Sequence, residues 1–319
     1  MNTTINGSEF CHVHWNPTAY NIGATVAYCL VFVVSLVGNS CIGIIVYKTK
    51  TLRKPINFFI VNMAMSDLLI PLAFIPLKVV NLYRHSWLIS GILGNAFCKL
   101  INFLFEVSYT VSIQSLILIA VGRFGAVVWP LHSPLINLKR CTFFILATWI
   151  VAMASMSPVL FAYTLDKYEG EVFCVSQWQG PHEESASRTV LAYYIVAVYT
   201  PIILLIIIYS IILIKLKLQK TPGQQSTDAE IQRNKRNTNA LKLAIATLLG
   251  LIFCKLLWSI ISINKYVYST LPCRIFLYEE VGWFFRMSYC AVNPCICFAF
   301  CRNYREGLKR LLKCCSDST

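Results

Sequence analysis

The sequence predicts an all-α membrane protein: a bundle of seven transmembrane helices followed by a short amphipathic cytoplasmic helix, helix eight. Of the 319 residues, 57% are hydrophobic and 13% are charged, a composition too apolar for a soluble domain of this size. Seven apolar segments each approach or exceed the ~20 residues that a spanning helix needs. They cover residues 20–47, 56–83, 97–128, 141–163, 189–216, 240–263 and 276–300. No internal repeat is evident in the sequence, so an inverted-repeat transporter has little support.

The residues before the first segment, 1–19, favour an extracellular N-terminus. Asn2-Thr3-Thr4 and Asn6-Gly7-Ser8 are acceptor sequences for N-glycosylation, which modifies lumenal segments. Because no apolar run there resembles a cleavable signal peptide, we expect the first helix to serve as its own insertion signal.

Lysine and arginine residues follow alternate segments: the first, the third, the fifth and the last. They are Lys48, Lys50, Arg53, Lys54, Lys139, Arg140, Lys215, Lys217, Lys220, Arg233, Lys235, Arg236, Arg302, Arg305, Lys309, Arg310 and Lys313. By the positive-inside rule these connections share the cytoplasmic side. The formal net charge of +14 therefore indicates a membrane orientation and not a nucleic-acid partner, which no other feature suggests.

The third segment carries Cys98 and, 25 residues later, Arg123. At about 1.5 Å of rise per residue the two lie roughly 37 Å apart, at opposite membrane faces. Phe105 and Ser112 share a helix face with Arg123, and we expect this face to look into the bundle. Four cysteines lie outside the membrane on this topology and allow three pairings: Cys11, Cys98, Cys174 and Cys273.

Markers in the predicted helices carry a family resemblance. They are Asn39, Asp67, Cys98, Arg123, Trp149, Pro201, Tyr209 and Asn293-Pro294. In this order the chain resembles the rhodopsin-like (class A) G protein-coupled receptors, most of all the peptide receptors, over residues 20–313. The resemblance implies a receptor domain over 20–300 in the plasma membrane. It also implies that an extracellular ligand activates a heterotrimeric G protein, with coupling through Arg123 and Tyr209.

The resemblance further implies two structural sites. In this family the cysteine that begins helix three bonds one in the second outer loop, which implies Cys98 to Cys174. Cys11 and Cys273 then remain, either as a second bond between the N-terminus and the last outer loop, which we favour, or as free thiols. Asp67, Ser112 and Asn293 match the family's sodium pocket, so Na⁺ is an expected ligand. The alternative for Asp67 is a structural pairing with Asn39 and Asn293.

Three motifs depart from the family pattern. They read Gly122-Arg123-Phe124, Cys254-Lys255-Leu256-Leu257 and Asn293-Pro294-Cys295-Ile296-Cys297. The first lacks the usual acid beside the arginine, which favours raised basal activity. The second lacks the proline that kinks a helix. The alternative to a signalling receptor is therefore a silent or scavenger receptor of the same fold.

The expected ligand is a peptide. Phe105 stands where receptors for small amines have an aspartate, and Arg286 stands where opsins have a lysine, so both those ligand classes are excluded. Glu280 and the acidic second outer loop favour basic peptides, whereas Lys255 and Arg286 favour an acidic ligand group, including an acidic lipid, or pair with Glu106 and Asp67. Six residues form the predicted ligand pocket: Phe105, Glu106, Tyr109, Lys255, Glu280 and Arg286.

Residues 301–319 form the predicted cytoplasmic end. Basic and apolar residues alternate at helical spacing, so we expect an amphipathic helix whose apolar side chains enter the inner lipid leaflet: Tyr304, Leu308, Leu311 and Leu312. Cys314 and Cys315 follow where palmitoylation is expected, and the short tail limits arrestin recruitment. No nucleophile and base pair, HExxH or ATP-binding loop is present in the sequence, so an enzyme is not predicted.

Overall fold

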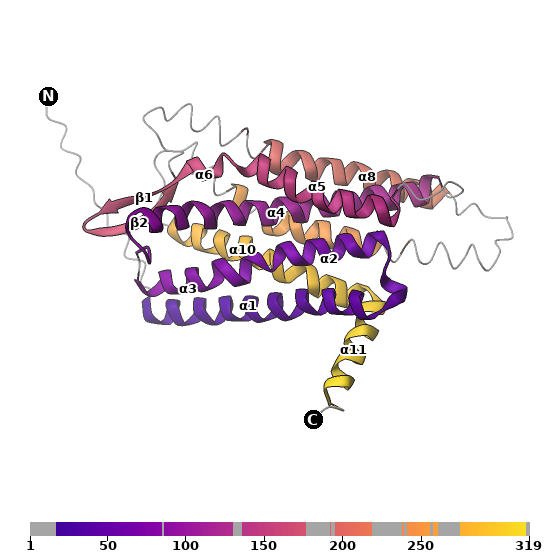
Figure 1. Cartoon of the computed structure of the whole chain (residues 1–319), viewed down its shortest axis with the longest axis horizontal. Helices are drawn as coiled ribbons and strands as arrows, with labels where there is room; N and C mark the ends of the chain where they lie inside the picture. The colour runs from indigo at the N-terminus through magenta and orange to yellow at the C-terminus, as the bar shows by residue number, and fades with distance from the viewer. Residues whose placement is uncertain are drawn as a thin grey trace.

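The computed structural model describes residues 17–84, 86–129, 136–176, 192, 195–218, 238, 241–255, 258–260 and 275–316. Within these residues, six helices are long and apolar enough to cross a membrane, and a seventh candidate is the bent pair Glu280–Phe300 and Arg302–Lys313. The helices pack side by side along one long axis (Figure 1). The predicted helical membrane bundle is therefore confirmed.

The helices follow the predicted apolar segments closely where those segments are described, whereas the two strands were not predicted. The first half contains α1 (Pro17–Lys48), η1 (Lys50–Leu52), α2 (Pro55–Asp67), η2 (Ile70–Phe74), α3 (Ile75–Arg84), α4 (Gly91–Val128), α5 (Leu138–Met156) and α6 (Val159–Ala162). The second half contains β1 (Tyr163–Tyr168), β2 (Glu171–Ser176), η3 (Ile195–Tyr199), α8 (Thr200–Leu218), the sixth span (Leu241–Ile260), α10 (Ile275–Phe300) and α11 (Arg302–Ser316).

The second span, Pro55–Arg84, is interrupted in the middle of the membrane. Its central part, η2, is a π-helical turn that contains Pro71. Proline has no amide hydrogen to donate, and such widened turns are one way in which a helix accommodates it. The turn shifts the helix face that α3 presents relative to α2, so a simple helical period does not hold across the whole span.

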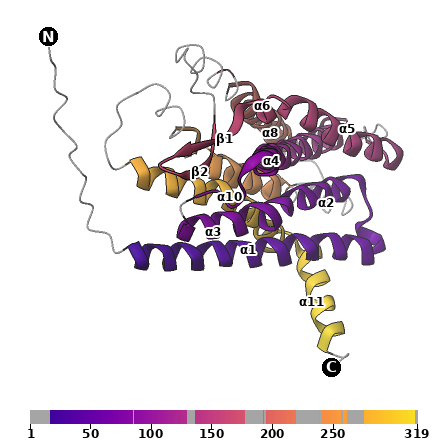
Figure 2. The same ribbon diagram turned by 60° about the vertical axis from the view of Figure 1, so that its left-hand side comes forward.

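Polar side chains join three helices around α4, which runs through the middle of the bundle (Figure 2). Asn62 of α2 donates hydrogen bonds to Ser115 of α4 at 2.9 Å and to Thr148 of α5 at 3.1 Å. Trp149 of α5 donates to the Asn62 carbonyl oxygen at 2.9 Å. Every polar group of the Asn62 side chain is therefore satisfied inside the bundle, where an unpaired one would be costly.

Close helix contact occurs where α1 crosses α10. A Cβ atom added at Gly38 would lie 2.6 Å from Cβ of Pro294. Small residues let membrane helices approach in this way. The glycine before the Asn39 marker is thus a packing requirement of the α1–α10 contact.

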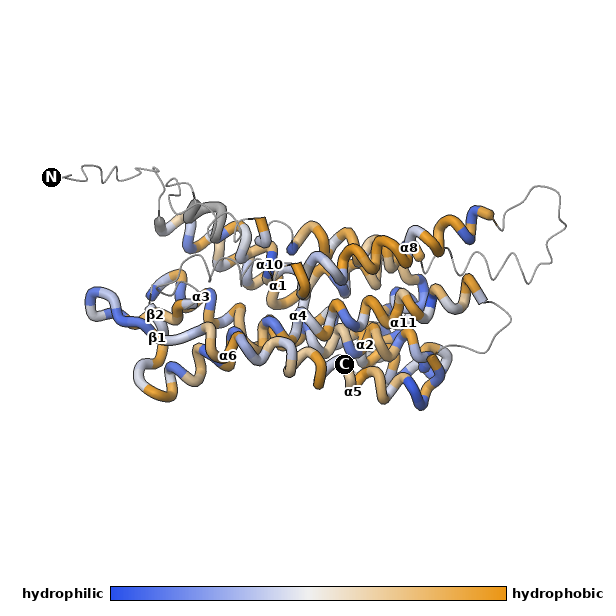
Figure 3. Tube along the Cα trace, turned by 90° about the horizontal axis from the view of Figure 1, so that it is seen from above, coloured by the Kyte–Doolittle hydropathy of each residue, from blue (hydrophilic) through white to orange (hydrophobic). Residues whose placement is uncertain are grey.

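A two-stranded hairpin covers one end of the bundle. β1 and β2 pair antiparallel, with Tyr168 opposite Glu171. The two turn residues, Glu169 and Gly170, have φ of 50° and 86°, which is typical of the tight turns that suit the twist of a hairpin. The tip of the hairpin is hydrophilic, in contrast to the helices behind it (Figure 3).

At the other end, α11 leaves the bundle at 97° to the end of α10 (Figure 1). The prediction that Tyr304 enters the lipid leaflet is wrong, because Tyr304 is buried in the protein, and Leu308 and Leu311 are partly buried against the same cluster. Tyr304 is 1% exposed, and the three join a core cluster with residues of α1 and α2. Gly307 permits this contact, since a Cβ there would lie 2.5 Å from Ile45 of α1. Leu312 is 63% exposed.

Candidate functional site

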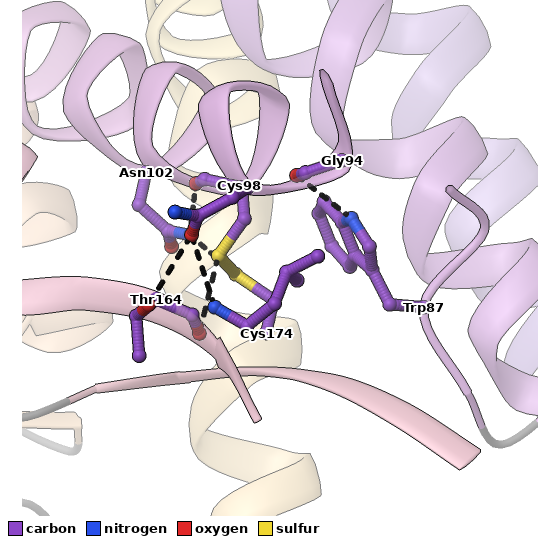
Figure 4. The surroundings of a disulfide bond; sticks show 8 residues. Trp87, Gly94, Cys98, Asn102, Thr164 and Cys174 are labelled. Carbon is purple, nitrogen blue, oxygen red and sulfur yellow. Dashed lines mark hydrogen bonds between the residues drawn. A yellow bond between two sulfur atoms is a disulfide. The ribbon is translucent and has the colours of Figure 1, made fainter. Parts of the chain in front are cut away.

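A disulfide attaches the hairpin to the start of α4. Cys98 and Cys174 are bonded, with their Cα atoms 5.7 Å apart, which confirms this pair (Figure 4). Asn102, one turn after Cys98, donates to the Cys98 carbonyl oxygen at 2.9 Å. The backbone amide of Trp87 donates to the Val172 carbonyl oxygen at 2.6 Å. The hairpin is thus held in place from two sides.

The buried carboxylate of α2 lies among polar groups from α4 and α10. Asp67 and Ser112 are fully buried, and Asn293 is 1% exposed. The Asn293 amide donates to Oδ2 of Asp67 at 2.6 Å, and the hydroxyl groups of Ser112 and Tyr289 are hydrogen-bonded. The predicted Asp67–Asn293 pairing is present. Tyr289 was missed, because nothing in its sequence context distinguishes it from a packing aromatic.

The Asn39 side chain donates its hydrogen bonds to partners other than Asp67. Its amide donates to the backbone oxygens of Ser35 and Cys290, each at 2.9 Å. The alternative in which Asp67 pairs with both Asn39 and Asn293 is therefore wrong for Asn39. The reason is the close α1–α10 contact, which brings Asn39 against a backbone carbonyl of α10.

Two oxygens of the Asp67 site have no hydrogen-bond partner among the described residues: Oδ1 of Asp67 and the amide oxygen of Asn293. An unbonded buried carboxylate oxygen is costly. Both oxygens are hard donors of the kind that alkali and alkaline-earth cations prefer. These residues therefore fit a small cation, and the Ser112 hydroxyl lies within electrostatic reach of the same carboxylate.

Closer to the hairpin, α4, α10 and the sixth span bring together Glu106, Tyr109, Lys255 and Arg286, which we call the charged cluster. Arg286 forms an ion pair with Glu106, and their side chains are 6% and 12% exposed. Lys255 is 3% exposed, and its Nζ lies 3.2 Å from the centroid of the Tyr109 ring. Glu106 acts on Lys255 only through space.

Aromatic rings line the charged cluster. The Arg286 guanidinium lies 4.4 Å from the ring centroid of Phe105 and 5.0 Å from those of Trp258 and Trp283. The two tryptophan rings are 4.5 Å apart. Both tryptophans were missed as site residues, although Trp258 follows Lys255 by three residues and so lies on nearly the same helix face.

Glu280 does not join this cluster. Its carboxylate pairs with Lys78 of α3 at 2.7 Å and accepts a hydrogen bond from Tyr20 of α1 at 3.2 Å. Three helices thus meet at Glu280. Glu280, which the sequence analysis assigned to the ligand pocket, is therefore neutralised by Lys78.

At the opposite end of α4, the charge of Arg123 acts on the Tyr209 hydroxyl of α8. Tyr209 is 3% exposed, and its hydroxyl has no hydrogen-bond partner among the described residues. Cys297 is 1% exposed and packs in the core beside Tyr304. The two predicted coupling residues are therefore neighbours, and Cys297 serves as a small packing residue.

Several predicted sites lie outside the described residues: Asn2, Asn6, Cys11 and Cys273. Cys314 and Cys315 lie in the last turn of α11, and their side chains are likewise outside the description.

The sequence is similar to a known family and to several known receptors. Residues 38–296 match the family described as "7 transmembrane receptor (rhodopsin family)". The RYamide receptor of Drosophila melanogaster is 25% identical over 313 residues, which cover 93% of this chain and 65% of that receptor. The human Substance-K receptor is 27% identical over 91% of this chain and 72% of its own length. The mouse Neuropeptide FF receptor 2 is 26% identical over 91% of this chain and 72% of its own length.

Proposed function

The chain belongs to the rhodopsin family of seven-transmembrane receptors, and from this premise we propose that it binds an extracellular peptide and activates a heterotrimeric G protein. The similar receptors are named for peptides, among them neuropeptide FF and a QRFP-like peptide. The observation that carries the proposal is the charged cluster inside the bundle, below a hairpin tied across one end.

The orientation of the chain follows from its charges and its disulfide. Basic residues end α1 and α8 and begin α5, and they recur along α11. Cytoplasmic ends of membrane helices carry such an excess, and a disulfide belongs in an oxidising compartment. We therefore place residues 1–19 outside the cell at the plasma membrane, the receptor domain over 20–300, and 301–319 inside. Glycans on Asn2 and Asn6, a second bond between Cys11 and Cys273, and palmitoyl groups on Cys314 and Cys315 agree with this orientation.

Charge balance identifies the ligand group that the site accepts. Among the described residues, the charged cluster holds two cations, Lys255 and Arg286, and one carboxylate, so these three side chains carry one excess positive charge away from water. Glu106 satisfies Arg286 directly, whereas the Lys255 ammonium lies on the Tyr109 ring. Buried cations are stabilised by an added anion. We assign Arg286 to the internal pair and Lys255 to an acidic group of the ligand, either a side-chain carboxylate or a free C-terminus.

Coupling depends on the foot of α4. In place of an acid beside Arg123 the chain has Gly122, and the charge of Arg123 acts on the Tyr209 hydroxyl. We infer that the receptor has raised basal activity, which an acid at 122 would lower. A peptide that binds near Lys255 acts on α4, α10 and the sixth span together, and α4 carries the effect to Arg123.

A cation site accompanies this assignment. Asp67, Ser112 and Asn293 supply oxygen donors for Na⁺, and a bound ion offsets the charge of the Asp67 carboxylate. We expect a higher unfolding temperature in sodium chloride than in choline chloride. This difference between the two salts should disappear in Asp67→Asn. Equal temperatures in both salts would refute the site.

The function is tested by G protein dissociation in cells that express the receptor at their surface. We expect a basal signal that Arg123→Ala abolishes and Gly122→Asp lowers, and a further rise with an activating peptide. Silence of surface-expressed protein in both conditions would instead support a scavenger receptor.

The ligand contact is tested with peptide pairs that differ only in a carboxylate or its amide. A charge-assisted hydrogen bond contributes about 1.5–3 kcal/mol, so Lys255→Gln should weaken the acid form roughly 10- to 150-fold and leave the amide form unchanged. Lys78→Gln, which removes a lysine that is paired with Glu280, is the matched control and should leave the ratio of acid to amide potency unchanged. Equal losses for both forms in Lys255→Gln would contradict the assignment.

A further inference from the structure

A hollow of about 340 Å³ lies between the end of α1, η1 and α11. Its apolar floor is formed by Ile45 of α1 and Leu311 of α11, which pack in one core cluster. Its rim carries Lys48, Lys50 and Arg310. The ligand-binding and coupling residues described above lie elsewhere in the bundle, so the hollow is a separate feature.

The lining of this hollow is cationic and rich in hydrogen-bond donors. Besides the three cations, the described residues that line it include Thr49 and Thr51, with their hydroxyl groups, and no acid. Among the described ion pairs, Glu306, the acid of α11, pairs with Arg302 at 2.6 Å, and Arg310 acts on it only through space. Three cations and two hydroxyl groups around one hollow suit a group with several anionic oxygens, such as a phosphate.

The position of the hollow indicates where such a group comes from. Lys48 is the last residue of a membrane-spanning helix, and α11 turns away at 97° to the end of α10, beside the end of α1 (Figure 2). The hollow therefore lies at the level of the lipid headgroups. Next to it, α1 presents exposed apolar side chains, with Ile44 43% and Tyr47 76% exposed. Acyl chains against these residues bring a lipid's headgroup to the three cations.

We propose that this hollow binds an anionic phospholipid of the cytoplasmic leaflet through a polyphosphorylated headgroup. Thr49, Thr51 and the three cations bind the phosphates, and the lipid tails lie along the outer face of α1. The lipid thereby bridges α1 and α11, two elements whose contact at Ile45 and Gly307 forms the wall of the hollow. Occupancy stabilises the position of α11 against the bundle.

The test uses the full chain in nanodiscs of phosphatidylcholine that contain a fluorescent phosphatidylinositol bisphosphate, with binding followed by energy transfer from protein tryptophan. Losing one charge-assisted contact to a phosphate lowers affinity about tenfold, so the variant Lys50→Gln/Arg310→Gln should bind about 100-fold more weakly. The control Lys309→Gln/Lys313→Gln removes the same charge from residues of α11 that are not among those lining the hollow. It should bind within about threefold of wild type, because the phosphatidylcholine surface around the receptor carries no net charge and these lysines touch no bound phosphate.

Four outcomes decide the proposal. Weaker binding confined to the rim variant supports it. Equal losses in the two variants overturn it, because general attraction of a basic helix then explains the binding. Equal affinity for phosphatidylserine at matched charge overturns the polyphosphate assignment, and equal affinity for soluble inositol phosphate in detergent overturns the lipid source. The readout is lipid binding and does not depend on whether the receptor signals.

Discussion

Replacing Glu106 by glutamine removes the carboxylate that Arg286 bonds, and it raises the excess charge of the charged cluster from one to two. Their side chains are 12% and 6% exposed, so water cannot compensate for the loss. Breaking a buried ion pair from one side costs about 3–5 kcal/mol, since the remaining charge stays buried without the carboxylate that neutralised it. At about 2–4 °C per kcal/mol for a domain of 150–250 residues, the unfolding temperature should fall by roughly 6–20 °C.

Two further ion pairs of the described residues provide graded controls. Glu280 and Lys78 are 16% and 17% exposed, and Glu306 and Arg302 are 45% and 83% exposed. Exposed pairs contribute little, because water and salt screen them. We therefore expect an intermediate loss for Glu280→Gln and an unfolding temperature close to wild type for Glu306→Gln.

The measurement is thermal unfolding of the purified receptor in one detergent, followed by thiol-reactive or tryptophan fluorescence. A fourth variant, Glu106→Gln/Arg286→Met, also removes the guanidinium of the ion pair and should recover much of the lost stability. The reasoning is refuted if Glu106→Gln unfolds within error of Glu306→Gln, or if the double variant is less stable than Glu106→Gln alone.

Three other changes test the packing. Gly38→Ala should destabilise the bundle by about 1–3 kcal/mol through overpacking against α10. Gly43→Ala in the same helix is the control and should be neutral, because no atom lies within 4 Å of the new Cβ. Equal effects of the two changes on the unfolding temperature would rule out the contact. Asn62→Ala should lower stability by about 1–2 kcal/mol through its lost interhelical bonds, read from the unfolding temperature. Cys98→Ser and Cys174→Ser should each cost about 2–5 kcal/mol, and the double variant should match either single one, since all three lack the same bond; additive losses would contradict this.

Much of the fold could be predicted from residue order alone. Local sequence predicts the spans and the inward face of α4, which carries Phe105 and Ser112. The family resemblance adds the bond between Cys98 and Cys174. The accuracy of the predicted spans has a physical reason: a helix in lipid must satisfy its own backbone and present apolar side chains, so length and hydropathy suffice to find it.

The candidate site was predicted less completely. Sequence identified Lys255, Arg286 and Glu106 as charges near one level of the bundle, but it left open which cation pairs internally. It also missed Tyr289, Trp258 and Trp283, because aromatic residues in apolar spans are common and carry no local mark of function.

Sequence by itself determined that this chain is a seven-helix membrane receptor, with a disulfide from Cys98 and basic ends on one side. Only the tertiary structure decided that Arg286 takes Glu106, that Asn39 bonds the backbone of α10, and that Tyr304 packs on the protein and not in lipid. Each of these depends on how far one helix is rotated about its axis and how closely it approaches its neighbour. Those two quantities are set by packing between distant segments, which no local pattern contains.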